Sequence, residues 1–236
     1  MTPQPAYLLH RRPYRETSAL VELITLDHGR VRAVAQGVQR AGSKSRSRLQ
    51  PFAPLHVTWS GDNELKRLRL IETHGAALLL AGEGLLCGLY ANELLTRLLP
   101  PMLPTAEVFA FYTAALGALP NPAGRAPALR RLEASLLETL DAEPVFLDLD
   151  DRELDPQARY VYQAGPRRFA RAPAGQGLDG RTLRLLAQGD WASPGLAGAA
   201  KSLMRAALAP LLGAKPLRSR ELMHQLAMRR RRGSGH

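Results

Sequence analysis

The chain has 236 residues, 45% of them hydrophobic, so it can bury a sizeable core without disulfides or metal ions. Its one cysteine, Cys87, excludes an intramolecular disulfide and fits a reducing compartment. No secretory signal pattern and no apolar run of membrane-spanning length appears, so we expect a cytoplasmic protein. The net charge of +11 favours a polyanionic partner.

Positive charge gathers toward the two ends of the chain. Residues 1–80 carry a net charge of +6, residues 81–165 carry −6, and residues 166–236 carry +11. A genome that prefers arginine codons would raise the arginine count, but it would not cluster the charges. We therefore expect polyanion contacts near both ends and a different role for the acidic middle.

Short apolar or alternating runs, typical of β-strands, fill the first 73 residues. The turn signals DHG at 27–29 and GDN at 61–63 each join two of these runs into a hairpin. Because no helical period interrupts them, the segment favours a small antiparallel barrel. An OB-type barrel is the first choice and an SH3-like barrel is the alternative. The five expected strands are 6–12, 19–26, 30–38, 51–60 and 64–73.

Beyond Gly75 the apolar residues recur at helical spacing. The expected helices are 85–100, 104–119, 127–140 with Pro127 in its first position, 179–188, 195–212 and 218–230. An acidic loop at 141–155 and a small extended patch at 159–172 separate the two groups of helices.

This pattern predicts the α+β class, with a five-stranded OB-type β-barrel followed by an all-helical domain that has a small extended C-terminal insertion. We expect a nucleic-acid-binding barrel at 1–78 and a helical domain at 79–228, with the extended patch near 156–172. The basic tail at 229–236 is expected to be disordered.

The segment GVQRAGSKSRSRLQPF at 37–52 concentrates positive charge between two expected strands. It contains Arg40, Lys44, Arg46 and Arg48 and no acidic residue. Because loops of small barrels often grip a nucleic-acid backbone, we expect these four side chains to bind phosphate groups. The alternative is a solvated loop whose charges only keep the protein in solution.

Other groups of the same region are weaker candidates for nucleic-acid contacts. Arg30 and Arg32 alternate along one expected strand, so they can point to the same side. Exposed aromatic rings stack on bases, and we expect Tyr14, which follows a proline, to supply one. Phe52 and Trp59 lie in expected strands, where an aromatic ring is more often part of the core. The remaining candidates for phosphate contacts are Arg11 and Arg12.

The segment KPLRSREL at 215–222 places Lys215, Arg218 and Arg220 at the expected start of a helix. A helix N-terminus with nearby cations forms an anion site, so this segment would extend a nucleic-acid path from the barrel. The alternative is that these cations pair with the acidic middle of the chain.

The sequence does not indicate an enzyme. The acidic run from Asp148 to Asp155 lies in one loop, whereas a two-metal nuclease needs carboxylates that converge from separate elements. We find no P-loop for ATP, no nucleophile paired with a histidine and an acid, and no set of four converging metal ligands. We therefore expect no cofactor and no metal site.

Six segments, in order from Tyr7 to Leu226, together resemble the RecO family of bacterial recombination mediators. No single segment is specific, but the ordered set is, and it covers nearly the whole chain. The segments are YLLHRRPYRETSALVELITLDHGRVRAVAQGVQR, LQPFAPLHV, ELKRL, GLYANELLTRLL, ALRRLEASLL and KPLRSRELMHQL.

The resemblance implies an N-terminal OB-fold, binding of single- and double-stranded DNA, and annealing of complementary strands. It also implies contact with the C-terminal tail of single-stranded DNA-binding protein, and partnership with RecR in loading RecA. Many family members bind zinc through four cysteines in the part that corresponds to about 146–170, where this chain has none. The resemblance is therefore to a zinc-free branch, whose extended patch must be held by packing.

The resemblance also implies a peptide site on the helix expected at 127–140. An acidic peptide with an apolar end needs a groove and a cation. On the residues alone, an ordinary amphipathic helix with solvated arginines is the better interpretation. The residues that would form the site are Arg130 and Arg131 beside Leu129, Leu132 and Leu136.

We therefore expect a non-enzymatic DNA-binding adaptor that acts in DNA repair and recombination at the nucleoid. The barrel would bind strand backbones, and the helical domain would bind protein partners on coated DNA. A structural RNA-binding module that uses the same barrel is the alternative.

Overall fold

The computed structural model describes residues 2–40, 42–193 and 195–233, the last four of these by their backbone only. The chain forms two compact units. One contains Met1–Asn121 together with Pro216–His236, and the other contains Pro122–Lys215. No helix in the described part of the chain is both long enough and apolar enough to span a membrane.

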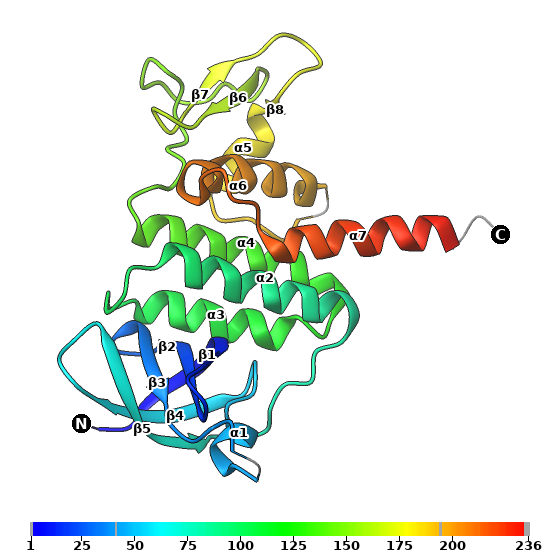
Figure 1. Cartoon of the computed structure of the whole chain (residues 1–236). Coiled ribbons are helices and arrows are strands. Elements are labelled where there is room, and N and C mark those ends of the chain that lie inside the picture. Colours follow the sequence, from blue (N-terminus) through cyan, green and yellow to red (C-terminus); the bar gives the residue numbers. More distant parts are fainter. Residues whose placement is uncertain (1, 41, 194, 234–236) are drawn as a thin grey trace. The chain divides into compact units, whose positions relative to one another are not determined.

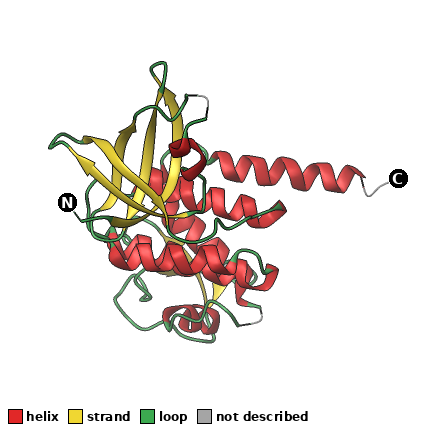
Figure 2. Ribbon diagram, turned by 90° about the horizontal axis from the view of Figure 1, so that it is seen from below, coloured by secondary structure: helices red, strands yellow, loops and turns green. Residues whose placement is uncertain are grey.

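Five strands of the first unit form a closed barrel in the order β1-β2-β3-β5-β4 (Figure 1). Figure 2 shows these strands in yellow and the turns that join them in green. The expected α+β class and its N-terminal OB-type barrel are thus confirmed. The strands are β1 (Gln4–Tyr14), β2 (Ser18–Thr25), β3 (Gly29–Ala35), β4 (Pro54–Ser60) and β5 (Leu65–Thr73).

Side chains that alternate along the strands fill the barrel interior. In β3, Val31, Ala33 and Ala35 point inward and are buried, while the residues between them face outward. The β2–β3 hairpin turns at DHG as expected, and Gly29 there has φ +61°. A Cβ atom on Gly29 would lie 1.7 Å from the carbonyl oxygen of Leu103, so only glycine fits this position.

The barrel differs from the expected all-antiparallel arrangement at one seam. β3 and β5 pair in parallel through three residue pairs, Arg32 with Leu65, Ala33 with Lys66 and Val34 with Arg67. The basic segment between β3 and β4 also contains a short helix, α1 (Lys44–Arg48), where we expected only a loop. The Ser43 side chain accepts a hydrogen bond from the backbone N–H of Arg46 and caps this helix.

The same unit contains the helices α2 (Gly82–Leu98), α3 (Ala106–Ala118) and α7 (Arg218–Gly233). Asn92 of α2 ties the helices to the barrel. Its side-chain amide donates to the carbonyl oxygens of Leu8 (3.4 Å) and Leu9 (3.0 Å), and its Oδ1 accepts from the hydroxyl of Tyr112 at 2.6 Å. Burial raises the pKa of Tyr112, which keeps this hydroxyl a neutral donor.

The second unit consists of four short or medium elements and two long helices. In it α4 packs on α6, and α5 packs on α6 and β8. Its small sheet has the order β7-β6-β8. The elements are α4 (Pro122–Thr139), β6 (Arg159–Gln163), β7 (Arg168–Arg171), β8 (Leu178–Asp179), α5 (Gly180–Ala187) and α6 (Leu196–Leu212).

Packing and ion pairs hold the small sheet, which is the extended patch expected from the sequence. The ring of Phe169 is fully buried and lies 5.4 Å from the rings of both Phe146 and Tyr162. Arginines of β7, of the turn before it and of α5 pair with acidic residues of the preceding loop. These ion pairs are Arg167–Glu143, Arg168–Asp151, Arg171–Asp155 and Arg184–Glu153.

Several helix boundaries differ from the expected ones, and the start of α4 and the end of α7 are two of them. The helix α4 begins at Pro122 and not at Pro127, because the earlier proline also suits a first turn, where its missing N–H costs least. The helix α7 continues through Gly233, although disorder was expected from residue 229. Residues 234–236 of that expected tail lie outside the described residues.

We predict that Asn92→Leu lowers the free energy of unfolding by about 3 kcal/mol, because it removes the donor to two carbonyl oxygens and the acceptor of the buried Tyr112 hydroxyl. The control Tyr112→Phe removes only one hydrogen bond and should cost about 1 kcal/mol. Urea unfolding of both variants measures the difference. Equal losses would show that Asn92 does not anchor the barrel to α2.

Candidate nucleic-acid interface

The basic segment between β3 and β4 presents its cations to solvent. Arg40, Lys44 and Arg46 are exposed, and the half-buried Arg48 donates to the carbonyl oxygen of Ile71 at 2.8 Å. Within the described residues, none of these four side chains forms an ion pair with a carboxylate. Their charge is therefore free to meet an external anion.

The segment is anchored at its far end. Leu49 and Phe52 are buried, and Nη1 of Arg11 donates to the carbonyl oxygen of Leu49 at 3.3 Å. Trp59 is buried as well, so both aromatic residues assigned to the core lie there. The anchored end fixes where the cations project, which matters because a charged loop binds best when it needs no reordering.

The two arginines of β3 share one side of the strand, but carboxylates of the barrel already neutralise them. Arg30 donates to Glu22 at 2.5 Å and to the carbonyl oxygen of Leu99 at 2.6 Å, and its side chain is only 12% exposed. Arg32 pairs with Glu64 at 2.6 Å and with Glu22 at 3.4 Å. The geometry argues against the phosphate contact expected for Arg30 and weakens the one expected for Arg32.

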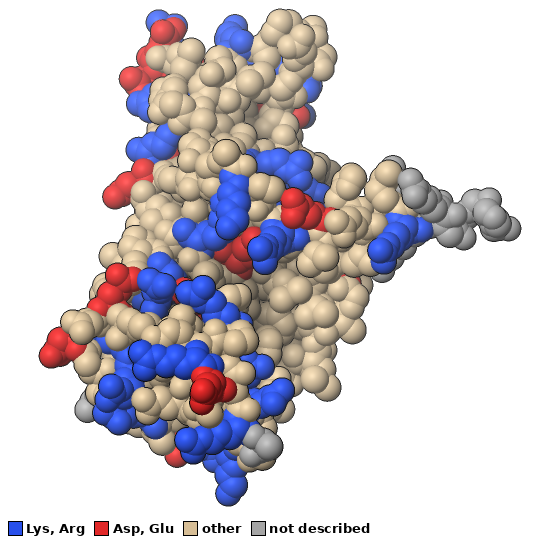
Figure 3. Space-filling view, viewed as in Figure 1, with Lys and Arg blue, Asp and Glu red and all other residues tan. Residues whose placement is uncertain are grey.

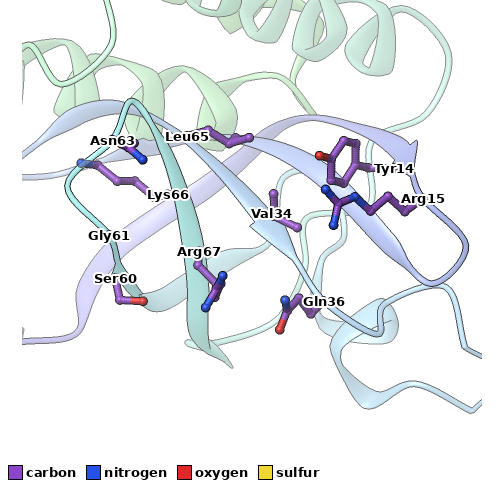
Figure 4. A pocket seen from close by; sticks show the side chains of 10 residues that line it. All are labelled: Tyr14, Arg15, Val34, Gln36, Ser60, Gly61, Asn63, Leu65, Lys66 and Arg67. Atoms are coloured by element: carbon purple, nitrogen blue, oxygen red, sulfur yellow. The ribbon is translucent and has the colours of Figure 1, made fainter.

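A groove that the sequence did not reveal opens beside these strands (Figure 4). It has a volume of about 350 Å³ and lies over the parallel β3–β5 seam. Tyr14 and Arg15 lie at one end of it, and Asn63 and Lys66 lie at the other. The remaining lining residues are Val34, Gln36, Ser60, Gly61, Leu65 and Arg67.

The lining of the groove is cationic and has no carboxylate. Three of its residues are basic, namely Arg15, Lys66 and Arg67. The guanidinium carbon of Arg15 lies 5.1 Å from the centre of the Tyr14 ring, in a cation–π contact. Figure 3 shows that Lys and Arg side chains cover much of the visible barrel face, with few acidic groups among them.

Three basic residues of β5 were not among the contacts expected from the sequence. Lys66, Arg67 and Arg69 lie in β5, and the first two line the groove. Arg67 and Arg69 come directly before and after the buried Leu68, so they face the opposite side of the strand. Arg69 donates to the hydroxyl of Ser60 at 2.8 Å. Of the cations expected in β1, Arg11 and Arg12 are exposed, and Tyr14 closes that strand at the edge of the groove.

Comparisons with known proteins agree with this architecture. The family profile of the recombination protein O N-terminal domain matches residues 1–76, and that of its C-terminal domain matches residues 80–221. The chain belongs to the RecO family.

Curated RecO relatives match over nearly their whole length. The DNA repair protein RecO of Pseudomonas aeruginosa (strain LESB58) is 45% identical over 223 residues, which cover 93% of each chain. That of Nitrosococcus oceani is 43% identical over 229 residues, covering 94% of this chain and 93% of the relative. That of Alteromonas mediterranea is 41% identical over 225 residues, covering 92% and 94%.

In this RecO-family protein the N-terminus of α7 already holds an anion. The Glu93 carboxylate accepts from the backbone N–H groups of Arg218 and Ser219, both at 2.9 Å, and from the Ser219 hydroxyl at 2.6 Å. Arg220 lies over the Tyr90 ring and donates to its hydroxyl at 3.1 Å. Glu93 thus occupies the N–H groups that were expected to hold a phosphate at this helix start. The side chains of Arg218 and, in the other unit, Lys215 are exposed, and their DNA contacts stay predictions.

The peptide groove expected on α4 of this RecO-family protein is closed. Leu129, Leu132 and Leu136 are 6%, 0% and 0% exposed, so this face is part of the core. Arg130 is buried too and pairs with Glu133 at 2.6 Å, which neutralises the cation that was to bind the peptide. An amphipathic helix buries its apolar stripe by default, and here that default holds. Only Arg131 of the expected set is exposed.

No group of three or more histidine, cysteine, aspartate or glutamate side chains suited to a metal ion occurs among the described residues. Cys87 is half-buried on α2. The expected acidic run is engaged in ion pairs with arginines, as described above. These residues therefore serve the small sheet of the second unit.

We predict that Glu93→Gln loosens the start of α7. Although partial burial by itself raises the pKa of Glu93, the hydrogen bonds from Ser219 and Arg218 and the charge of Arg97 lower it below 4.5. A carboxylate with a lowered pKa stabilises the fold above its ordinary value, and this stabilisation is lost as the pH falls through the lowered pKa. In the wild type, Glu93 should therefore stay ionised and hold the start of α7 from pH 7 down to about pH 5.

Hydrogen exchange of α7 peptides at neutral pH tests this prediction, with faster exchange at 218–221 expected in Glu93→Gln. The control is Glu221→Gln, which removes the same charge from the exposed side of the first turn of α7. Faster exchange in the control and not in Glu93→Gln would contradict the assignment.

Proposed function

We propose that this RecO-family protein binds single- and double-stranded DNA through its barrel and acts in DNA repair and homologous recombination. The observation that carries the proposal is the set of free cations in the β3–β4 segment, beside a groove lined by further cations and no carboxylate. Family membership supports the choice of DNA, because the curated relatives are named DNA repair proteins.

Annealing of complementary strands follows from the same charges. Two DNA strands repel each other through their phosphates, and a surface that neutralises phosphates on both lowers this repulsion. Arg40, Lys44 and Arg46 are exposed and, within the described chain, not paired with carboxylates, so they can act on either strand. In this role the protein is an adaptor and not an enzyme.

Loading of RecA would need protein partners as well as DNA. We propose that the protein contacts the C-terminal tail of single-stranded DNA-binding protein, together with RecR. The buried leucine face of α4 does not offer a site for that tail. Exposed apolar side chains of α7 are Leu222, Leu226 and Met228, each more than 40% exposed.

Binding of structural RNA is the competing function for a cationic barrel. Backbone contacts do not distinguish the two nucleic acids, since both carry phosphates, and recognition of RNA depends on the 2′-hydroxyl. Competition between single-stranded DNA and RNA of the same length and sequence separates the two functions. We expect DNA to displace RNA, and a preference for RNA would overturn the proposal.

We predict that replacing Arg40, Lys44 and Arg46 together by glutamine weakens DNA binding and strand annealing while the fold persists. Each lost phosphate contact lowers the slope of log affinity against log salt by about 0.7 on single strands, so three lower it by about 2. Fluorescence anisotropy with labelled oligonucleotides at a series of salt concentrations measures the slope.

A matched control removes three exposed cations of the second unit, Arg181, Lys201 and Arg205, by the same substitution. This variant loses the same net charge as the first. Because the three residues lie outside the proposed interface, we expect its salt slope to stay near that of the wild type. Equal loss in both variants would show that net charge matters and the β3–β4 segment does not. An unchanged slope in the first variant would count directly against the proposed interface.

A further inference from the structure

The groove over the β3–β5 seam has features beyond a phosphate-binding surface. We propose that it holds one unpaired base of a DNA strand, with Tyr14 as the stacking ring. This inference rests on the proposed binding of DNA and deepens it, because it names which form of DNA the groove selects. Arg15, Lys66 and Arg67 would then bind the phosphates on either side of that base.

The size and lining of the groove fit a single nucleotide. A volume of about 350 Å³ is enough for a small molecule but lies near the lower end of ligand sites, so a duplex cannot enter. Its walls combine apolar surface from Val34 and Leu65 with the amides of Gln36 and Asn63, which can pair with the edge of a base. Cations at both ends match the phosphates that flank a base (Figure 4).

The aromatic ring of Tyr14 and the planar guanidinium of Arg15 lie together at one end of the groove. Arg15 lies over the ring of Tyr14 at 5.1 Å, and both residues line the groove. Nucleic-acid bases stack on aromatic rings and on guanidinium planes alike, without strong sequence preference. The contact with Arg15 also restrains the Tyr14 ring, so that less side-chain freedom is lost when a base binds.

The stacking contact provides selectivity that the β3–β4 segment lacks. In a duplex each base is already stacked on its neighbours and paired, so its faces are not available to Tyr14. The phosphates bound by Arg40, Lys44 and Arg46 are present in both forms of DNA. Stacking on Tyr14 therefore adds affinity for single strands only, and the phosphate contacts add affinity for both forms.

The experiment compares the full-length wild type with Tyr14→Leu, and uses Tyr14→Phe as the matched control. We expect Tyr14→Leu to bind single-stranded DNA roughly 5- to 100-fold more weakly, the range given by one lost base stack. Binding of duplex of the same sequence should stay unchanged. Tyr14→Phe keeps the ring and should bind both forms like the wild type.

An oligonucleotide with abasic residues adds a second arm that does not depend on the folding of any variant. The wild type should bind the abasic strand more weakly than the normal strand, by a factor similar to that of Tyr14→Leu. In Tyr14→Leu the same abasic residues should cause no further loss, because the stacking partner is already gone.

The possible results separate the two proposals. If the wild type binds neither form of DNA, the proposed function fails. If the wild type binds DNA but tolerates abasic residues, or if Tyr14→Leu weakens single strands and duplex equally, the base-binding groove is overturned and the wider proposal stands. Selective loss for single strands together with the abasic effect supports the groove.

Discussion

Closure of the barrel depends on a short parallel seam between β3 and β5, and the candidate interface depends on that closure. Three residue pairs form the seam, and the β5 member of each pair also lines the groove. Without the seam, β5 would leave β3, and the turn after β4 would separate from the end of β1. The packing that buries Ala33 and Leu68 inside the barrel therefore also brings Tyr14 and Lys66 to one groove.

The distribution of acidic residues decides which arginines of the barrel are free. Glu22 and Glu64 lie next to β3, and they neutralise Arg30 and Arg32. No carboxylate of the described chain reaches Arg40, Lys44 or Arg46 within ion-pair distance. A largely buried arginine such as Arg30 is costly without such a partner, whereas an exposed one is not. The carboxylates thus neutralise the arginines of β3 and leave those of the β3–β4 segment without an ion-pair partner in the described chain.

Much of the barrel was accessible from the sequence, and the limits have clear physical causes. Alternation and the turn signal DHG located β2 and β3, and the register they set places Glu22 opposite Arg32. The ion pair between Glu22 and Arg32 could therefore be predicted from the register of the hairpin. The parallel seam joins residues about thirty positions apart, so no local signal reveals it. The groove depends on that seam, which is why Arg15, Lys66 and Arg67 were missed.

The leucines of α4 show a second limit. A stripe of leucines at helical spacing looks the same whether it fills a core or lines an open groove. Only the observed burial of Leu132 and Leu136 distinguishes the two cases. The ion pair of Arg130 is different, because its partner Glu133 lies three residues further along the same helix. That spacing could be recognised from the sequence.

If both proposals hold, two kinds of DNA contact on one barrel would favour annealing in one direction. The proposed phosphate contacts of the β3–β4 segment would not depend on base pairing, so they would persist from single strands to duplex. A base held on Tyr14 must leave the groove before it can pair, and the protein then loses that contact. On this scheme affinity falls as the duplex forms, and the fall comes from stacking and so is less sensitive to salt than the phosphate contacts are. The barrel would thus hold unpaired strands more firmly than their annealed product.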